Sequence, residues 1–126
     1  MLYMFLLYSD PELPEPQDVM RQHFALLAKA RERGGYICSE ALGGTANATT
    51  VRLRQGKALV TDGPFAETKE VLGGFYILDC QDLDEALEYA AQIPDAQNGA
   101  VEVRPVLHVP DWPYETAAER LRQPMG

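Results

Sequence analysis

Two short segments of this chain are apolar at almost every position. Residues 2–8 read Leu-Tyr-Met-Phe-Leu-Leu-Tyr and end at Ser-Asp-Pro, and residues 73–80 carry the run Phe-Tyr-Ile-Leu at their centre. A short continuous apolar run bounded by turn residues is typical of a strand that is buried on both faces of its sheet. The sequence therefore predicts a sheet whose first and fourth strands need cover on two sides.

Two amphipathic helices are predicted to cover one side of this sheet. The first spans residues 17–33 and ends at a Gly-Gly pair, which is a common C-terminal stop. A second helix begins at the capping pattern of Asp82 with Glu85 and ends at Pro94. The apolar arc of the first helix consists of Val19, Met20, Phe24, Leu26, Leu27 and Ala30.

Further strands are predicted at residues 36–42, at 49–54 and 57–61 as a hairpin, and from 100 to about 109. The order strand, helix, strand, hairpin, strand, helix, strand is that of a ferredoxin-like split βαβ fold, in the α+β class, with an inserted hairpin. Two helices cover only one face of such a sheet. We therefore expect a homodimer in which the uncovered face meets the same face of a second chain.

The chain of 126 residues has the length of one domain. We assign residues 1–109 to the ferredoxin-like domain and residues 110–126 to a C-terminal tail, which is extended and has a short helical pattern around residues 115–122. The 19 Asp and Glu residues outnumber the 11 Lys and Arg residues. This balance argues against nucleic acid and anionic membranes as partners, because phosphate contacts need a dense group of basic residues.

The cysteines and the N-terminal sequence indicate the cellular location. Cys38 and Cys80 lie in apolar runs without metal-ligand spacing, and we expect them to be free thiols in a reducing compartment. Residues 1–8 lack the basic flank of a secretory signal, and no stretch approaches the roughly 20 apolar residues of a membrane span. We therefore expect a cytoplasmic protein.

The most distinctive segment is the run of residues 62–75, which begins with Asp-Gly-Pro-Phe. The Asp-Gly-Pro part predicts a sharp exit from the hairpin, and we expect Phe65 to fill a place in the core. With this run and with residues 49–52, 82–86 and 101–105, the chain resembles the YCII-related family, in the branch named for its Asp-Gly-Pro-Phe motif. The resemblance implies a dimeric α/β barrel, in which two ferredoxin-like sheets face each other.

For activity the resemblance implies less. Members of the wider family look like small enzymes built around a histidine and a carboxylate, and one branch consists of dehydrochlorinases. The Asp-Gly-Pro-Phe branch is largely without an assigned reaction and often lies beside sigma-factor genes. A role beside a protein partner in a transcription system is therefore one implication.

His23 is the position that matches the family's histidine, eleven residues before Gly34. The helical spacing independently places His23 in the middle of the apolar arc, so its imidazole should point into protein. The resemblance favours Asp10 as its carboxylate partner, with Glu40 as the alternative. Such a pair could transfer protons, whereas a hydrogen-bonded histidine in the core would have a structural role only.

Five charged residues are candidate ligand-binding groups. Arg52 and Arg104 are expected on strands among apolar neighbours, where each could hold an anionic small molecule or form an ion pair with a glutamate. Asp62, Glu67 and Lys69 belong to the charged loop after the hairpin, which could line the mouth of a cleft or form a solvated rim.

Two functions are open from the sequence. Motifs for nicotinamide, nucleotides and zinc are missing from it, so we expect no cofactor and no metal. We favour a dimeric ligand-binding or regulatory module. The alternative is a cofactor-independent lyase or isomerase that acts on an anionic or oxygenated small molecule. An open cavity shared by His23 and a carboxylate would support the enzyme, and a sealed histidine the module.

Overall fold

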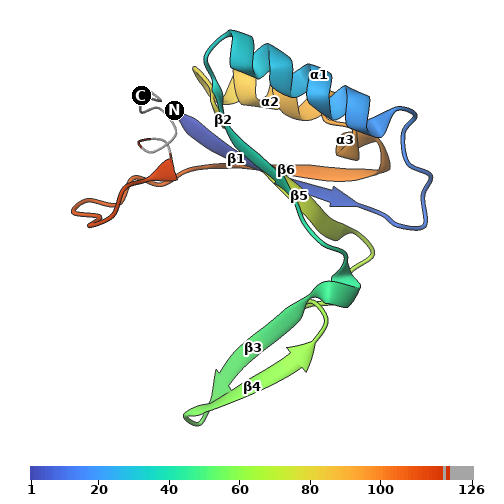
Figure 1. Ribbon diagram of the computed structural model, residues 1–126, viewed down its shortest axis with the longest axis vertical. Helices are drawn as coiled ribbons and strands as arrows, with labels where there is room; N and C mark the ends of the chain where they lie inside the picture. The colour runs from blue at the N-terminus through green and yellow to red at the C-terminus, as the bar shows by residue number, and fades with distance from the viewer. Residues whose placement is uncertain (118, 120–126) are drawn as a thin grey trace, which may run out of the picture.

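A computed structural model describes residues 1–117 and residue 119 (Figure 1). The elements agree with the predicted order, and most bounds lie within two residues of the predicted ones. In chain order they are β1 (Leu2–Ser9), α1 (Val19–Glu32), β2 (Tyr36–Ala41), the 3-10 turn η1 (Thr45–Asn47), β3 (Thr49–Arg54), β4 (Lys57–Asp62), β5 (Val71–Asp79), α2 (Leu83–Gln92), α3 (Asp95–Asn98) and β6 (Gly99–Pro105).

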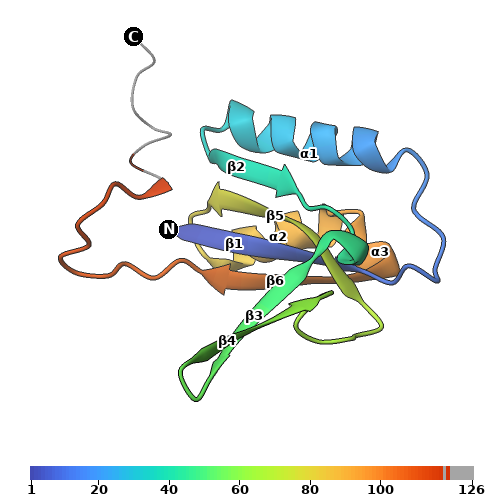
Figure 2. The ribbon, with the colours of Figure 1, turned by 60° about the horizontal axis from the view of Figure 1, so that its bottom comes forward.

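The main sheet has four strands in the order β2-β5-β1-β6, and its neighbouring strands are antiparallel. The helices lie on one side of it (Figure 2). This is the ferredoxin-like arrangement, so the predicted α+β fold with an inserted hairpin is confirmed.

The core lies between this sheet and the helices. Strand residues alternate between the two faces of a sheet, and Phe5 and Leu78 point toward the helices and are fully buried. Leu2, Met4 and Leu6 alternate with the core residues of β1 and stay partly exposed on the other face. The strands are thus apolar on both faces, as predicted, and the helices cover one of the two.

The buried face of α1 is narrower than predicted. Leu26 and Ala30 are buried, whereas Met20 and Phe24 are 55% and 62% exposed. The helical period alone placed these two side chains in the core. They instead border a cavity between α1 and the sheet.

Helix α2 begins as predicted, because the Asp82 carboxylate accepts a hydrogen bond of 2.9 Å from the Glu85 amide. The sequence did not predict α3, which follows Pro94 directly. Helix α3 is tied to the chain after β1, since the Asp10 amide donates to the Asn98 carbonyl at 2.8 Å.

Strands β3 and β4 form a separate two-stranded sheet that projects away from α1 and α2 (Figure 1). The loop after it carries Phe65, which is 75% exposed, so its predicted place in the core is wrong. Gly63, with a φ of 102°, turns the chain at the base of the hairpin. The loop then leads Phe65 back along the hairpin, where the Arg52 guanidinium lies 5.3 Å from the centre of its ring.

Cys38 and Cys80 are free thiols, as predicted. The chain after β6 is extended from residue 106, and the Val106 amide still donates to the Leu2 carbonyl at 2.9 Å. Of the helical pattern predicted around residues 115–122, residues 117 and 119 are helical, whereas residues 118 and 120–122 are outside the described part. Within the described part, no helix is long and apolar enough to cross a membrane.

Candidate functional site

A cavity of about 410 Å³ lies between α1 and the helix-covered face of the sheet. One wall is apolar and includes Val19, Met20, Phe24 and Leu27 of α1. The other end is polar, with the side chains of β2, β5 and α3. The polar lining residues are Ser9, Glu15, His23, Ser39, Glu40, Tyr76, Asp95 and Asn98.

Three of these side chains form a chain of contacts at the cavity wall. The Nδ1 atom of His23 is hydrogen-bonded to the Tyr76 hydroxyl. The Nε2 atom of His23 lies 3.4 Å from Oδ1 of Asp95. The imidazole is therefore hydrogen-bonded through Nδ1 and faces a carboxylate with Nε2, and its ring stands edge-on to the Tyr76 ring at an interplanar angle of 78°.

Each member of this group is positioned by a different element. His23 faces the sheet from α1, one turn before Leu26 and Leu27. Tyr76 points to the same side because it occupies an inward position of β5, beside the outward Phe75. Asp95 is the first residue of α3, where a carboxylate is favoured by the backbone N–H groups of the first turn.

Burial, together with the nearby Asp95 carboxylate, raises the pKa of the Tyr76 phenol well above its ordinary value. The Tyr76 hydroxyl is placed to donate its O–H to Nδ1 of His23, because Nε2 is the nitrogen that faces the Asp95 carboxylate. With Nδ1 as the acceptor, the proton of a neutral imidazole is on Nε2, toward Asp95. Oδ1 of Asp95 is shielded from solvent and accepts no hydrogen bond of full geometry from the described residues. The group therefore places a buried carboxylate oxygen beside the imidazole, without a full hydrogen bond between the two.

The structure pairs His23 with Asp95 and not with Asp10. Asp10 is buried, with 3% exposure, but its carboxylate accepts from the Glu12 amide at 2.9 Å and lies 3.6 Å from Nζ of Lys69. It serves the loop after β1, as is common for an aspartate that bonds amides of its own turn. Glu40, the alternative partner, lines the cavity.

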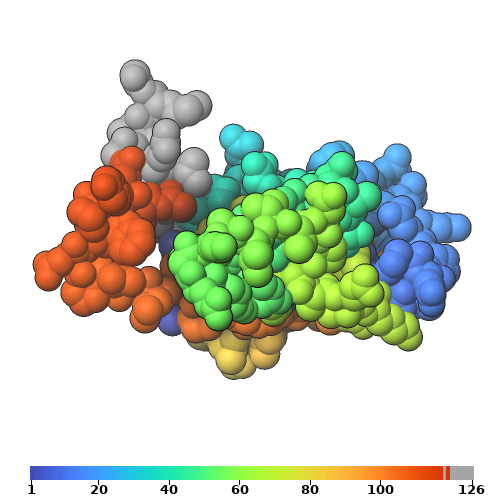
Figure 3. Space-filling view, turned by 90° about the horizontal axis from the view of Figure 1, so that it is seen from below, coloured from blue at the N-terminus to red at the C-terminus, as the bar shows by residue number. Residues whose placement is uncertain are grey.

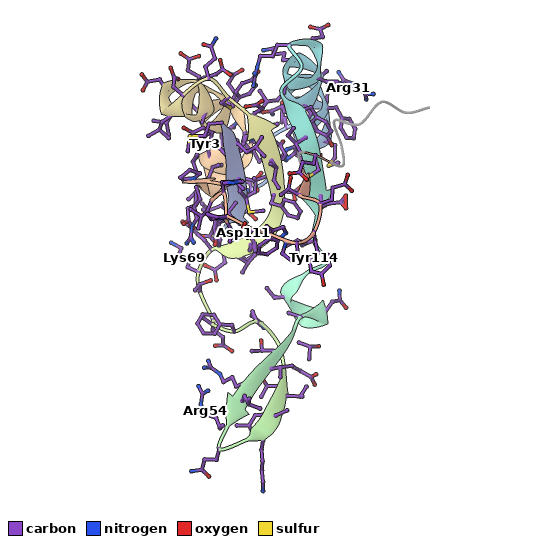
Figure 4. The ribbon with its side chains drawn as sticks, turned by 90° about the vertical axis from the view of Figure 1, so that its left-hand side faces the viewer. Tyr3, Arg31, Arg54, Lys69, Asp111 and Tyr114 are labelled. Carbon is purple, nitrogen blue, oxygen red and sulfur yellow. The ribbon has the colours of Figure 1, made fainter. Side chains whose placement is uncertain are left out.

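The five predicted ligand-binding residues lie outside this cavity. Arg52 and Asp62 belong to the hairpin. Arg104 is 2.5 Å from the Glu102 carboxylate, which is the ion pair weighed as the alternative from the sequence. Glu67 is exposed, and Lys69 is the partner of Asp10. Figure 4 shows Lys69 at the end of the main sheet that faces the hairpin.

Sequence reasoning missed Tyr76 and Asp95 as site residues. Tyr76 belongs to the apolar run that predicts a strand buried on both faces, and this pattern does not distinguish it as a site residue. Its hydroxyl is the signal that was available, since a buried phenol needs a hydrogen-bond partner. Asp95 had only its position after Pro94 to distinguish it. Among the described residues there is no group of three or more possible metal ligands.

The fold and the cavity define a small ferredoxin-like α+β protein with a histidine–tyrosine–carboxylate group between helix and sheet. The model of the YCII-related domain matches residues 1–112, and the chain belongs to that family. An uncharacterized protein of Rhizobium meliloti (strain 1021) is 42% identical to it over 114 residues, which cover 84% of this chain and 92% of that protein.

A solved structure has the same fold. It is 5-chloro-2-hydroxyhydroquinone dehydrochlorinase from Burkholderia phenoliruptrix AC1100, in complex with 2,5-dihydroxybenzoquinone. The match has a TM-score of 0.50 at 17% sequence identity, and it covers 86% of this chain and 96% of that one. At this identity the likeness shows the fold.

Proposed function

We propose that this protein is a cofactor-independent acid–base enzyme in which Tyr76, His23 and Asp95 move a proton of a small molecule bound in the cavity. The observation that carries the proposal is the position of His23, which is held between a phenol and a carboxylate at the wall of an open cavity. A sealed histidine would have supported the ligand-binding or regulatory module that the sequence favoured. Access to the group supports the enzyme instead.

The proposed step is a proton relay. The Tyr76 oxygen takes a proton from the substrate while its own proton passes to Nδ1 of His23, with which it is already hydrogen-bonded. The imidazolium that forms is stabilised by the Asp95 carboxylate, 3.4 Å from Nε2. Return of the proton to another atom of the substrate gives an isomerisation, and its return to a leaving group gives an elimination.

The charges around the cavity favour an uncharged or cationic substrate. Three carboxylates line the cavity, those of Glu15, Glu40 and Asp95. No Lys or Arg is among its described lining residues. A bound carboxylate or phosphate would meet like charge without a cation to offset it. Met20 and Phe24 at the apolar wall suit a ring or hydrocarbon body. Of the anionic and oxygenated substrates left open by the sequence, we therefore propose an oxygenated one, a neutral molecule with a hydroxyl or carbonyl group.

Two further expectations stay with the proposal. The free thiols Cys38 and Cys80 support a cytoplasmic location. The partly exposed apolar side chains of Leu2, Met4 and Leu6 support a homodimer through the sheet face opposite the helices.

Proton exchange tests the relay without knowledge of the product. A panel of uncharged phenols and enolisable ketones is incubated with the protein in D2O, and loss of C–H signals is followed by NMR. We expect exchange with at least one compound, and a loss of about 100- to 10,000-fold for Tyr76→Phe and His23→Gln. Tyr3→Phe, another buried tyrosine of the core, is the matched control and should keep the rate.

The Asp95 carboxylate is tested by Asp95→Asn, with the exposed Asp84→Asn of α2 as its control. Binding of compounds without exchange in the wild-type protein would support the module instead. Exchange at the wild-type rate in Tyr76→Phe would show that the relay does not pass through the phenol.

A further inference from the structure

The β3–β4 hairpin, residues 49–62, has no role in the cavity, and we refer to it as the arm. Its register pairs Val51 with Val60 and Leu53 with Ala58 on one face. The side chains of Val51, Leu53 and Val60 are 63%, 67% and 64% exposed. One face of the arm is thus an exposed apolar surface.

An isolated two-stranded hairpin is at best marginally stable in water. Hydrogen bonds fasten the arm at its base, where Thr50 donates to the Gly63 carbonyl at 2.8 Å and the Gly63 amide donates to the Ala48 carbonyl at 2.7 Å. An apolar surface that covers the outer part of the arm would therefore stabilise it.

The arm extends on the side of the sheet that the helices leave open (Figures 1 and 2). Seen from below, it stands out in front of this side of the molecule (Figure 3). The open face itself presents Leu6, Phe75 and Ile77, which are partly exposed and paired across β1 and β5. A partner molecule bound to this open face of the sheet would lie beside the arm.

The distribution of charge along the chain indicates which partner molecule fits the arm. The arm holds three of the 11 Lys and Arg residues of the chain, Arg52, Arg54 and Lys57, and one of its 19 Asp and Glu residues. The rest of the chain therefore has eight cations against eighteen carboxylates. A basic arm on an acidic body is complementary to a second copy of the same chain. Two-fold symmetry lets both arms make the same contact.

We propose that the arm binds the body of a second copy, with its Val51–Leu53–Val60 face against apolar surface. Arg54 and Lys57 are paired on the other face of the arm, next to its turn, and their long side chains reach past the tip toward the partner's carboxylates. The arm then holds together a dimer whose sheets face each other. A polyanion such as nucleic acid does not fit, because three cations on a chain with a net charge of −8 provide little attraction for it.

Removal of the arm tests the proposal cleanly. Because Ala48 and Gly63 are hydrogen-bonded to each other, residues 49–62 can be replaced by a Gly-Ser linker that leaves β2 and β5 in place. Sedimentation equilibrium then gives the dissociation constant of the dimer, and circular dichroism checks the fold. We expect a wild-type dimer, and a dissociation constant at least tenfold higher without the arm.

A pair of charge reversals keeps the test independent of the deletion. Arg54→Glu lies on the arm, and Arg31→Glu lies on α1 at the other end of the molecule (Figure 4). Both arginines are exposed. We expect Arg54→Glu to weaken the dimer, and Arg31→Glu to leave it unchanged. Added salt should reduce the difference between them.

Three results would overturn the proposal. One is a wild-type chain that stays monomeric at every protein concentration up to the highest soluble one. The arm would then bind another partner. The second is an armless variant that dimerises as tightly as the wild type. The third is an equal effect of Arg54→Glu and Arg31→Glu.

Discussion

The exposure of Phe65 predicts that its removal costs less stability than the removal of the buried Phe5. Phe5 is fully buried, so Phe5→Ala removes the whole transfer free energy of the side chain and leaves a cavity, for a cost of about 3–5 kcal/mol. Phe65 stays 75% exposed. Full burial of a phenylalanine side chain stabilises a protein by about 2 kcal/mol, and Phe65 gains about a quarter of this. Its contact with Arg52 adds about 0.5–1 kcal/mol. We therefore expect Phe65→Ala to cost about 1 kcal/mol.

Urea titrations followed by circular dichroism compare the two variants with the wild type. They are run first at a protein concentration at which the chain is monomeric and then at a higher one, because association stabilises the folded state by mass action. A cost for Phe65→Ala that matches the cost for Phe5→Ala in the monomer would refute the exposed position. A cost that grows only with protein concentration would place Phe65 in contact with a second copy.

Three further predictions concern stability. Asp82→Ala should lower the free energy of unfolding by about 1 kcal/mol in urea titrations, since the Glu85 amide loses its acceptor. Gly99→Ala should cost about 1–3 kcal/mol in the same assay, because its Cβ would lie 2.0 Å from the Tyr8 carbonyl oxygen and β6 would have to move. The raised pKa of Tyr76 means that the folded state holds its proton where the unfolded state has lost it. Stability should therefore fall as the pH rises above about 10, and Tyr76→Phe should reduce this fall in thermal unfolding followed from pH 8 to pH 11.

Much of the fold was predictable because its signals are local. Periodicity gave α1 and the strands, and the Asp82 cap marked the beginning of α2. The topology followed from the order of these elements along the chain, and the open face of the sheet followed from counting faces, since β1 is apolar on both sides and the helices cover one. Helix α3 was not predictable, because a helix of four residues shows no period and Pro94 normally ends a helix rather than begins the next.

The site was predictable only in part, because it is assembled by tertiary contacts. His23 could be found from its place on an apolar helix face. Its partners come from β5 and α3, which are far away in the sequence, and no local pattern distinguishes Asp95 from Asp10. Asp10 follows an apolar strand and is buried, as a site residue would be, yet its carboxylate bonds the Glu12 amide. Only the packing of α3 against the sheet shows which carboxylate reaches the imidazole.

The residues that the sequence misplaced in the core share one property. Met20, Phe24 and Phe65 are large, apolar and exposed. An apolar residue in a periodic pattern indicates that a surface is covered, but the pattern is the same whether the cover is the core, a ligand or another chain. Met20 and Phe24 lie at the cavity, and Phe65 lies against Arg52 of the arm. Both are places where, under the proposals above, a molecule outside this chain supplies the cover, a small ligand at the first and a second copy at the other.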